Sequence, residues 1–132
     1  MNLPISLSFI KPVYAHCDLP CGVYDPAQAR IEATSVKAIM DKYSAGLDDH
    51  AQTRAIVIKE ERAELVKHHL MVLWVDYFKS EHLEKYPDLH TKFWVAMKLA
   101  GDCKHHVEPE YGQKLLEAID EIAEIFWKTK KA

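Results

Sequence analysis

Glycine and cysteine are scarce in this chain of 132 residues, which contains four glycines and three cysteines. So little glycine favours long helices over a sheet protein with many tight turns. Three cysteines are an odd number and too few for a disulfide framework. The chain also lacks any apolar run close to the roughly 20 residues that a membrane span requires. We therefore expect no membrane-spanning segment.

Positive charge is not in excess either, because the formal net charge at pH 7 is −3. A chain of this charge carries no basic footprint for nucleic acid, and we expect no nucleic-acid partner. Hydrophobic residues make up 48% and charged residues 28%, which is ordinary for a globular protein. At this length we expect one domain that buries a core of its own.

Four segments show the apolar period of amphipathic helices, and we expect them at residues 26–46, 48–79, 87–101 and from 108 onward. Asp25 can cap the first, Pro26 suits its first position, and Gly46 is a typical stop. The predicted core positions are Ile31, Val36, Ile39 and Tyr43, then Ile56, Ala63, Val66, Leu70, Leu73 and Tyr77, then Leu89, Phe93, Ala96 and Met97, and finally Leu115, Ile119, Ile122 and Phe126. The pattern predicts an all-α protein, an antiparallel up-and-down four-helix bundle.

The histidines of the helical segments do not suggest a metal centre inside the bundle. Di-iron bundles use Glu-x-x-His pairs, and no histidine here has a glutamate three residues before it. His68 and His69 are neighbours, so on a helix they point about 100° apart. We interpret them, and the pair His105 and His106, as solvated or hydrogen-bonded. Cys103 stands apart from the other cysteines and is expected to be a free structural thiol.

Reactive side chains gather instead in residues 16–26, HCDLPCGVYDP, which we call the hook. Cys17 and Cys21 have a C-x₃-C spacing, which is weak evidence of a metal site by itself. A disulfide across so short a loop would be strained, and a zinc site would need two further ligands.

The preceding residues 1–15, MNLPISLSFIKPVYA, decide how the hook can bind. They match a secretory signal poorly, because no basic residue precedes the apolar run and Pro4, Lys11 and Pro12 interrupt it. A short removable leader and an ordinary disordered terminus are the other interpretations. If the chain is cut after Ala15, His16 provides a free amine beside an amide nitrogen and two thiolates. Such an N₂S₂ set favours Ni(II) or Cu(II), and the His16 imidazole can add an axial ligand.

Several stretches of this sequence resemble the nickel superoxide dismutase family: the hook, the AQARIEA that follows it from Ala27, and then QTRA, VIKEERAEL, KHH, DYFK, EKYP and the FWKTKKA end. Residues 88–112 depart most from the family pattern. The resemblance implies a removable leader at 1–15 and a domain at 16–132 that combines a nickel hook with the bundle. It also implies superoxide as substrate, a homohexamer, a leader-processing protease and a nickel-loading factor.

The resemblance implies one nickel ion per chain and a role for each matching residue. The metal ligands would be His16, through its amine and imidazole, Cys17, through its backbone nitrogen and thiolate, and Cys21. Pro20 would be a cis proline of the hook. Asp18, Tyr24 and Tyr77 would lie at the substrate approach. Glu32 and Arg62 would orient the His16 ring.

Other interpretations of these residues remain open at this point. Tyr77 lies on the apolar heptad and could be a core residue, and Glu32 with Arg62 could be a surface ion pair. The same hook could serve a non-enzymatic nickel or copper carrier, or the cysteines could be incidental to a helical interaction module. Without residues 1–15 the net charge becomes −4, so attraction of superoxide must be local, for example from Lys79. Free thiolates suit a reducing compartment, and we expect the cytoplasm.

Overall fold

The computed structural model describes residues 22–131, which form helices and turns and contain no strand. The elements are α1 (Ala27–Ala45), α2 (Asp49–Val72), a π-helical turn η2 (Leu73–Tyr77), α3 (Ser80–Lys85), α4 (Leu89–His105) and α5 (Pro109–Lys131). Among these described residues no helix is both long and apolar enough to cross a membrane.

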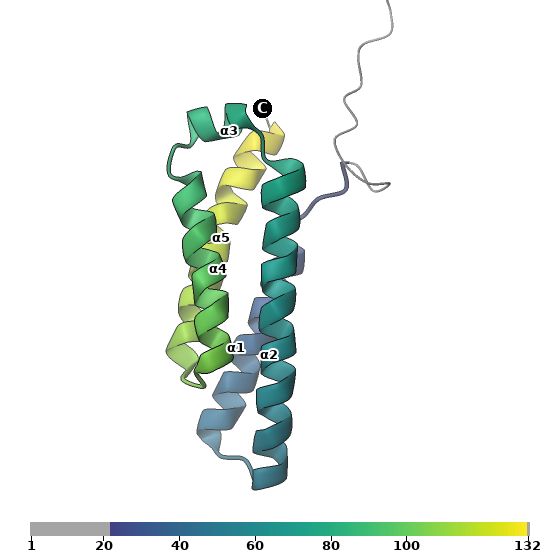
Figure 1. Ribbon diagram of the computed structural model, residues 1–132, viewed down its shortest axis with the longest axis vertical. Coiled ribbons are helices and arrows are strands. Elements are labelled where there is room, and N and C mark those ends of the chain that lie inside the picture. Colours follow the sequence, from purple (N-terminus) through teal and green to yellow (C-terminus); the bar gives the residue numbers. More distant parts are fainter. Residues whose placement is uncertain (1–21, 132) are drawn as a thin grey trace, which may run out of the picture.

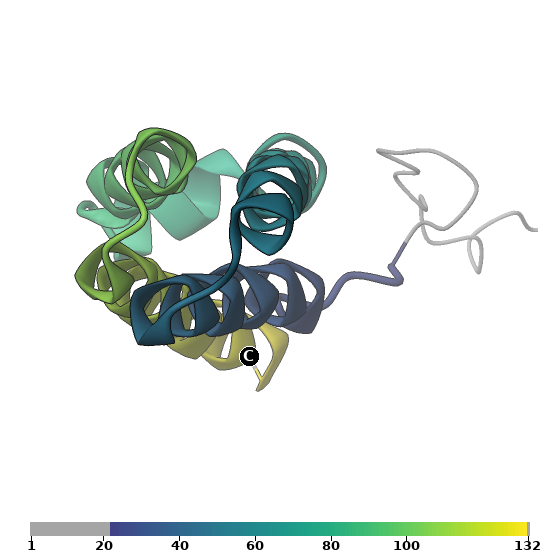
Figure 2. The same ribbon diagram turned by 90° about the horizontal axis from the view of Figure 1, so that it is seen from below.

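The four long helices run up and down side by side, as predicted (Figure 1). α1 packs against α2 and α5, and α4 packs against the same two helices, so that the four form a square when seen end on (Figure 2). The short α3 crosses one end of the bundle, beside the C-terminal end of α5 (Figure 1). We call this the α3 end.

The predicted start of the first helix is confirmed by its capping contacts. The backbone N–H of Ala27 donates to Asp25 Oδ1 over 2.8 Å, and Pro26 has helical dihedral angles. At the other end, Gly46 has φ of +106°, a conformation that other residues rarely adopt, and α1 stops there. α2 starts in the same way, because Asp48 Oδ1 accepts from the Ala51 N–H over 2.8 Å.

The core consists of the inward stripes of the four long helices. Its buried side chains are Ala29, Ala33, Val36 and Met40, then Ala63, Val66, Leu70, Leu73 and Phe78, then Leu89, Phe93, Ala96, Ala100 and Cys103, and finally Leu115, Ile119, Ile122, Ile125 and Phe126. Two predicted core positions are wrong, since Ile31 is 63% and Ile56 is 37% exposed. In α1 the small Ala29 and Ala33 take the inward stripe, which allows the neighbouring helix backbone to approach closely.

In α2 a lysine, and not Ile56, is buried in the core. Lys59 is 2% exposed and lies on the same stripe as Ala63 and Val66. Its ammonium donates to the backbone carbonyls of Cys103, Lys104 and His106 at the C-terminal end of α4. The last carbonyls of a helix lack partners within it, and they carry the negative end of its dipole. Lys59 therefore caps α4 from a neighbouring helix.

Three boundaries differ from the prediction. The helix expected over 48–79 ends two residues earlier, in the π-helical turn, where the Phe78 N–H donates to Leu73 O over 3.0 Å. The helix α3 was not predicted. Gly101 does not end α4, which continues to His105 because Cys103, beyond the glycine, is fully buried. That burial outweighs the roughly 1 kcal/mol that a helical glycine costs.

Cys103 is a free and buried thiol, which confirms the prediction for it. Burial raises its pKa to about 11, so the thiol stays protonated and unreactive at neutral pH.

Candidate functional site

The structure describes only some of the predicted site residues. His16, Cys17, Asp18, Pro20 and Cys21 lie outside the described residues, and so do the predicted cis bond and the leader. Tyr24, Tyr77, Glu32 and Arg62 lie within them. The structure can therefore show the surroundings into which the hook leads.

The hook enters the described part of the chain at an exposed turn. Gly22 has φ of +84°, which a side chain would strain, and Val23 is 78% exposed. Pro26 is then buried at the start of α1. Residues 22–26 thus lead from the surface directly into the bundle.

Tyr24 and Tyr77 are 53 residues apart in the sequence and lie together in the structure. Their ring centroids are 5.7 Å apart, with the ring planes tilted by 57°. Tyr24 precedes α1, and Tyr77 is the last residue of η2. The two tyrosines that the resemblance placed at the substrate approach are therefore in contact. Tyr24 is three residues after Cys21 in the chain.

Tyr77 is held by aromatic rings on two sides. The Phe126 ring of α5 lies 4.4 Å from it, and the His82 ring of α3 stacks on it at 5.8 Å with an interplanar angle of 15°. The Tyr77 hydroxyl forms a 2.7 Å hydrogen bond with Thr129 Oγ1 of α5. These four residues, which we call the Tyr77 cluster, join three elements at the α3 end of the bundle.

His82 links this cluster to the start of α3. The backbone N–H of Lys79 donates to His82 Nδ1 over 3.1 Å, so in this arrangement the ring proton belongs on Nε2. Burial lowers the pKa of His82, and the charges of Lys79 and Lys85 lower it further, against the opposing effect of Glu81. His82 is therefore a neutral ring at pH 7.

A positive charge also lies over the cluster. The ammonium of Lys130 is 5.3 Å from the centroid of the Tyr77 ring and 5.5 Å from that of Phe126, as in a cation–π contact. Lys79, the lysine named from the sequence, is exposed and directly precedes α3. Local positive charge at this end would attract a small anion despite the negative net charge.

Glu32 and Arg62 join α1 to α2 through a two-pronged ion pair. Arg62 Nη1 lies 3.0 Å from Glu32 Oε2 and 3.3 Å from Oε1. The Glu32 side chain is only 14% exposed, whereas that of Arg62 is 44% exposed. The nearby His69 has a pKa lowered by burial and then by His68, while Glu32 raises it. The predicted pair is thus formed, with its carboxylate largely covered.

Residues 22–131 contain no group of three or more histidine, cysteine, aspartate or glutamate side chains able to hold a metal ion. The remaining set of strong donors is the one read from the sequence at His16, Cys17 and Cys21.

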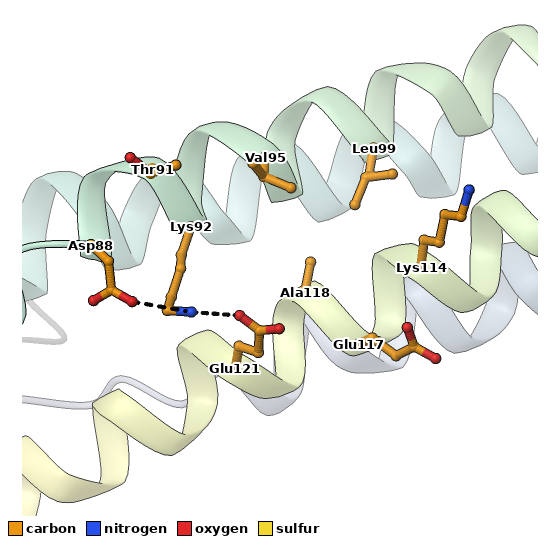
Figure 3. Close-up of a pocket in the computed structure, with 9 residues that line it drawn as sticks. All are labelled: Asp88, Thr91, Lys92, Val95, Leu99, Lys114, Glu117, Ala118 and Glu121. Atoms are coloured by element: carbon orange, nitrogen blue, oxygen red, sulfur yellow. Dashed lines mark hydrogen bonds and ion pairs between the residues drawn. The ribbon is translucent and has the colours of Figure 1, made fainter.

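The groove between α4 and α5 is a second candidate site, and Figure 3 shows the residues that line it. Its floor is apolar, with Val95, Leu99 and Ala118. Lys92 lies 2.6 Å from Glu121 and 3.3 Å from Asp88, so its charge is already paired (Figure 3). None of the lining residues belongs to the predicted site or the Tyr77 cluster.

Sequence reasoning missed Thr129, Lys130 and His82. A signal for the first two was present, because positions 129 and 130 continue the 115, 119, 122, 126 stripe by three and four residues. No comparable signal existed for His82, since its contact depends on α3 crossing the end of the bundle.

Known proteins resemble this chain in sequence. The profile of the nickel-containing superoxide dismutase family matches residues 11–130. A superoxide dismutase [Ni] of Streptomyces seoulensis is 62% identical over 120 residues, which are 91% of this chain and 92% of the relative. One from Streptomyces coelicolor is 60% identical over the same shares of both chains.

Solved structures resemble it in fold. A native nickel superoxide dismutase structure has a TM-score of 0.85 at 60% identity, covering 89% of this chain and 100% of its own. A nickel-containing superoxide dismutase in the oxidized state gives a TM-score of 0.85 at 62% identity and the same coverage. The match of both sequence and fold over most of its length means that this chain belongs to the nickel-containing superoxide dismutase family.

Proposed function

We propose that this chain is a nickel superoxide dismutase that converts two superoxide ions and two protons into dioxygen and hydrogen peroxide. The observation that carries the proposal is the extent of the family match. Residues 11–130 include every predicted hook donor, both tyrosines of the 5.7 Å contact and both members of the ion pair. Family membership makes the chain an oxidoreductase that uses nickel.

The donor chemistry of the hook fits nickel. The ligands would be the amine and imidazole of His16, the backbone nitrogen and thiolate of Cys17, and the thiolate of Cys21. When bound there, one nickel ion per chain supplies a one-electron couple between Ni(II) and Ni(III), which anionic sulfur and amidate donors bring within the range of superoxide. The protein then has to deliver two protons for each peroxide that leaves.

Cleavage after Ala15 is the second part of the proposal. It is supported by the length of the solved native chain, which is covered completely by 89% of this chain. That share of 132 residues is about 117, the length of residues 16–132. The amine of His16 exists only in a chain that starts there.

The described residues have supporting roles. Tyr24 and Tyr77 border the approach to the hook, where their hydroxyls order water and anions, and Asp18 would belong to the same approach. Lys130 supplies local positive charge above Tyr77. Glu32 and Arg62 would hold the His16 ring in place, because metal-bound histidines depend on such outer partners.

The test of the function is a measurement on the processed chain. We expect the mass of residues 16–132, about one nickel per chain, and superoxide removal that disappears when a chelator removes the metal. Nickel binding without superoxide turnover would instead identify a carrier. Absence of nickel from a chain of the processed mass would overturn the proposal.

A second prediction concerns the ion pair. Arg62→Met is expected to weaken nickel binding or activity by about 10-fold or more, because loss of an outer partner frees the ligand that it orients. The free energy of unfolding should fall by about 1 kcal/mol, since the Arg62 side chain is 44% exposed but the Glu32 carboxylate that loses its partner is only 14% exposed. Nickel titration, superoxide kinetics and urea unfolding measure the three quantities.

Arg30 provides the matched control for this variant. It forms a 2.7 Å pair with Asp120, also between two helices, and both side chains are about half exposed. Arg30→Met should leave nickel affinity and activity unchanged. Equal effects of Arg30→Met and Arg62→Met would show that Arg62 acts only as a surface ion pair.

We also propose a homohexamer in the cytoplasm, matured by a leader-processing protease and a nickel-loading factor. Support for assembly comes from large apolar side chains that one copy leaves uncovered. They occur on several elements: Ile31 on α1, Val57 on α2, Val75 in η2 and Trp94 on α4. Burial of such side chains between copies would stabilise an oligomer.

A further inference from the structure

Thr129 controls the direction of the hydrogen bond that Tyr77 makes. Thr129 Oγ1 has one proton, and it lies 2.6 Å from the backbone carbonyl of Phe126, which can only accept. The same oxygen lies 2.7 Å from the Tyr77 hydroxyl. When both bonds are made, the threonine proton goes to Phe126 and the tyrosine proton goes to Thr129. Tyr77 is therefore a donor towards α5.

The surroundings of Tyr77 keep it in this orientation. Phe126, which supplies the accepting carbonyl, also packs its ring 4.4 Å from the phenol, and His82 stacks on the phenol. His82 is itself fixed by the Lys79 N–H. The phenol can turn away from Thr129 only by disturbing contacts to two other elements. With its proton directed to Thr129, the Tyr77 oxygen offers only lone pairs to the site.

We propose that Thr129 is a positioning residue that fixes the Tyr77 hydroxyl as a hydrogen-bond acceptor towards the substrate approach. The proposal rests on the proposed function, because that function places the substrate approach beside Tyr77. An acceptor oxygen does not bind the superoxide anion directly. It orients a water molecule whose own hydrogen points to the substrate. Protons for peroxide thus come from solvent through that water, and the Tyr77 hydroxyl keeps its proton.

Water can also reach the Thr129 end of this hydrogen bond. Thr129 and His82 line a hollow of about 340 Å³ together with Glu81 and Lys85, and neither Tyr24 nor Tyr77 lines it. A hollow of this size holds several water molecules, and its charged and polar lining offers them partners.

The variant Thr129→Val tests the proposal, because valine has nearly the shape of threonine and lacks the hydroxyl. The direction of the Tyr77 bond is read from the tyrosine doublet in ultraviolet resonance Raman spectra. Subtracting the spectrum of Tyr77→Phe isolates the Tyr77 signal. We expect this signal to lose its donor character in Thr129→Val and to keep it in Thr129→Ser. The measurement works without nickel, so it stands even if the proposed activity fails.

Kinetics provide the second readout. kcat/KM for superoxide is expected to fall about fivefold in Thr129→Val, the effect of one neutral hydrogen bond, and to recover in Thr129→Ser. In the Tyr77→Phe background, Thr129→Val should have no further effect. Thr34→Val is the control, since Thr34 bonds the Arg30 carbonyl of its own helix in the same manner, away from the Tyr77 cluster.

Two results would overturn the proposal. One is a Tyr77 Raman signal that is unchanged in Thr129→Val, which would mean that Thr129 does not accept its proton. The other is an equal loss of activity from Thr129→Val with and without the Tyr77 hydroxyl, which would mean that Thr129 does not act through Tyr77.

Discussion

A chain that retains Ala15 before His16 is expected to lose its nickel and more than about 100-fold of its superoxide dismutase activity, since even outer partners of a metal account for 10- to 100-fold. The extra residue turns the amine of His16 into an amide nitrogen, which is a far weaker donor. The Cys17 nitrogen and the two thiolates remain, but the N₂S₂ set has lost its amine. Metal analysis and rapid superoxide kinetics on the chains starting at residue 15 and residue 16 measure the effect.

The matched comparison separates binding from folding. Helix content and unfolding should be the same in both chains, because the helices lie within residues 27–131. Removal of the extra residue by an aminopeptidase should restore nickel binding and activity to the same sample. Full activity in the chain that retains Ala15 would rule out the terminal amine as a ligand.

Lys59→Met is the substitution expected to affect stability most, with a loss of about 3 kcal/mol in the free energy of unfolding. Methionine fills the space of the lysine stem but cannot donate to the carbonyls of Cys103, Lys104 and His106. These groups would then be left without partners at a helix end beside the core. Urea unfolding measures the loss, which corresponds to a decrease in Tm of about 10 °C.

Lys104→Met is the control for this substitution. Lys104 also joins α2 and α4, through a 2.9 Å contact with Glu64, but its side chain and that of Glu64 are 30% and 60% exposed. Its loss should cost less than about 1 kcal/mol, as for other exposed pairs. A comparable loss from both substitutions would show that burial of the Lys59 ammonium adds nothing.

Lys59 also shows why the core was only partly predictable. The periodic apolar residues of α2 place Ile56 in the seam, because a lysine at position 59 reads as a solvent residue. The charge becomes stable in the core only where unpaired carbonyls of another helix meet it. The sequence of α2 does not reveal the end of α4, where Cys103 is 44 residues away from Lys59.

The candidate site was also only partly predictable from the sequence. The hook donors and the identity of the metal follow from residue types and spacing, together with the resemblance, because ligands within six consecutive residues need no distant partner. The Tyr77 cluster could not be read in this way. Its members come from η2, α3 and α5, and Tyr77 by itself fits a core heptad position equally well.

The sequence alone determined the class of fold, the four long helices, their caps and the donor-rich hook, because each depends on local periodicity or on neighbouring residues. The tertiary structure decided which side chains of those helices are buried, that α3 closes one end, and that Tyr24 lies against Tyr77. It also decided the direction of the Tyr77 hydroxyl. These features depend on contacts between residues far apart in the chain, and such contacts form only when the helices pack.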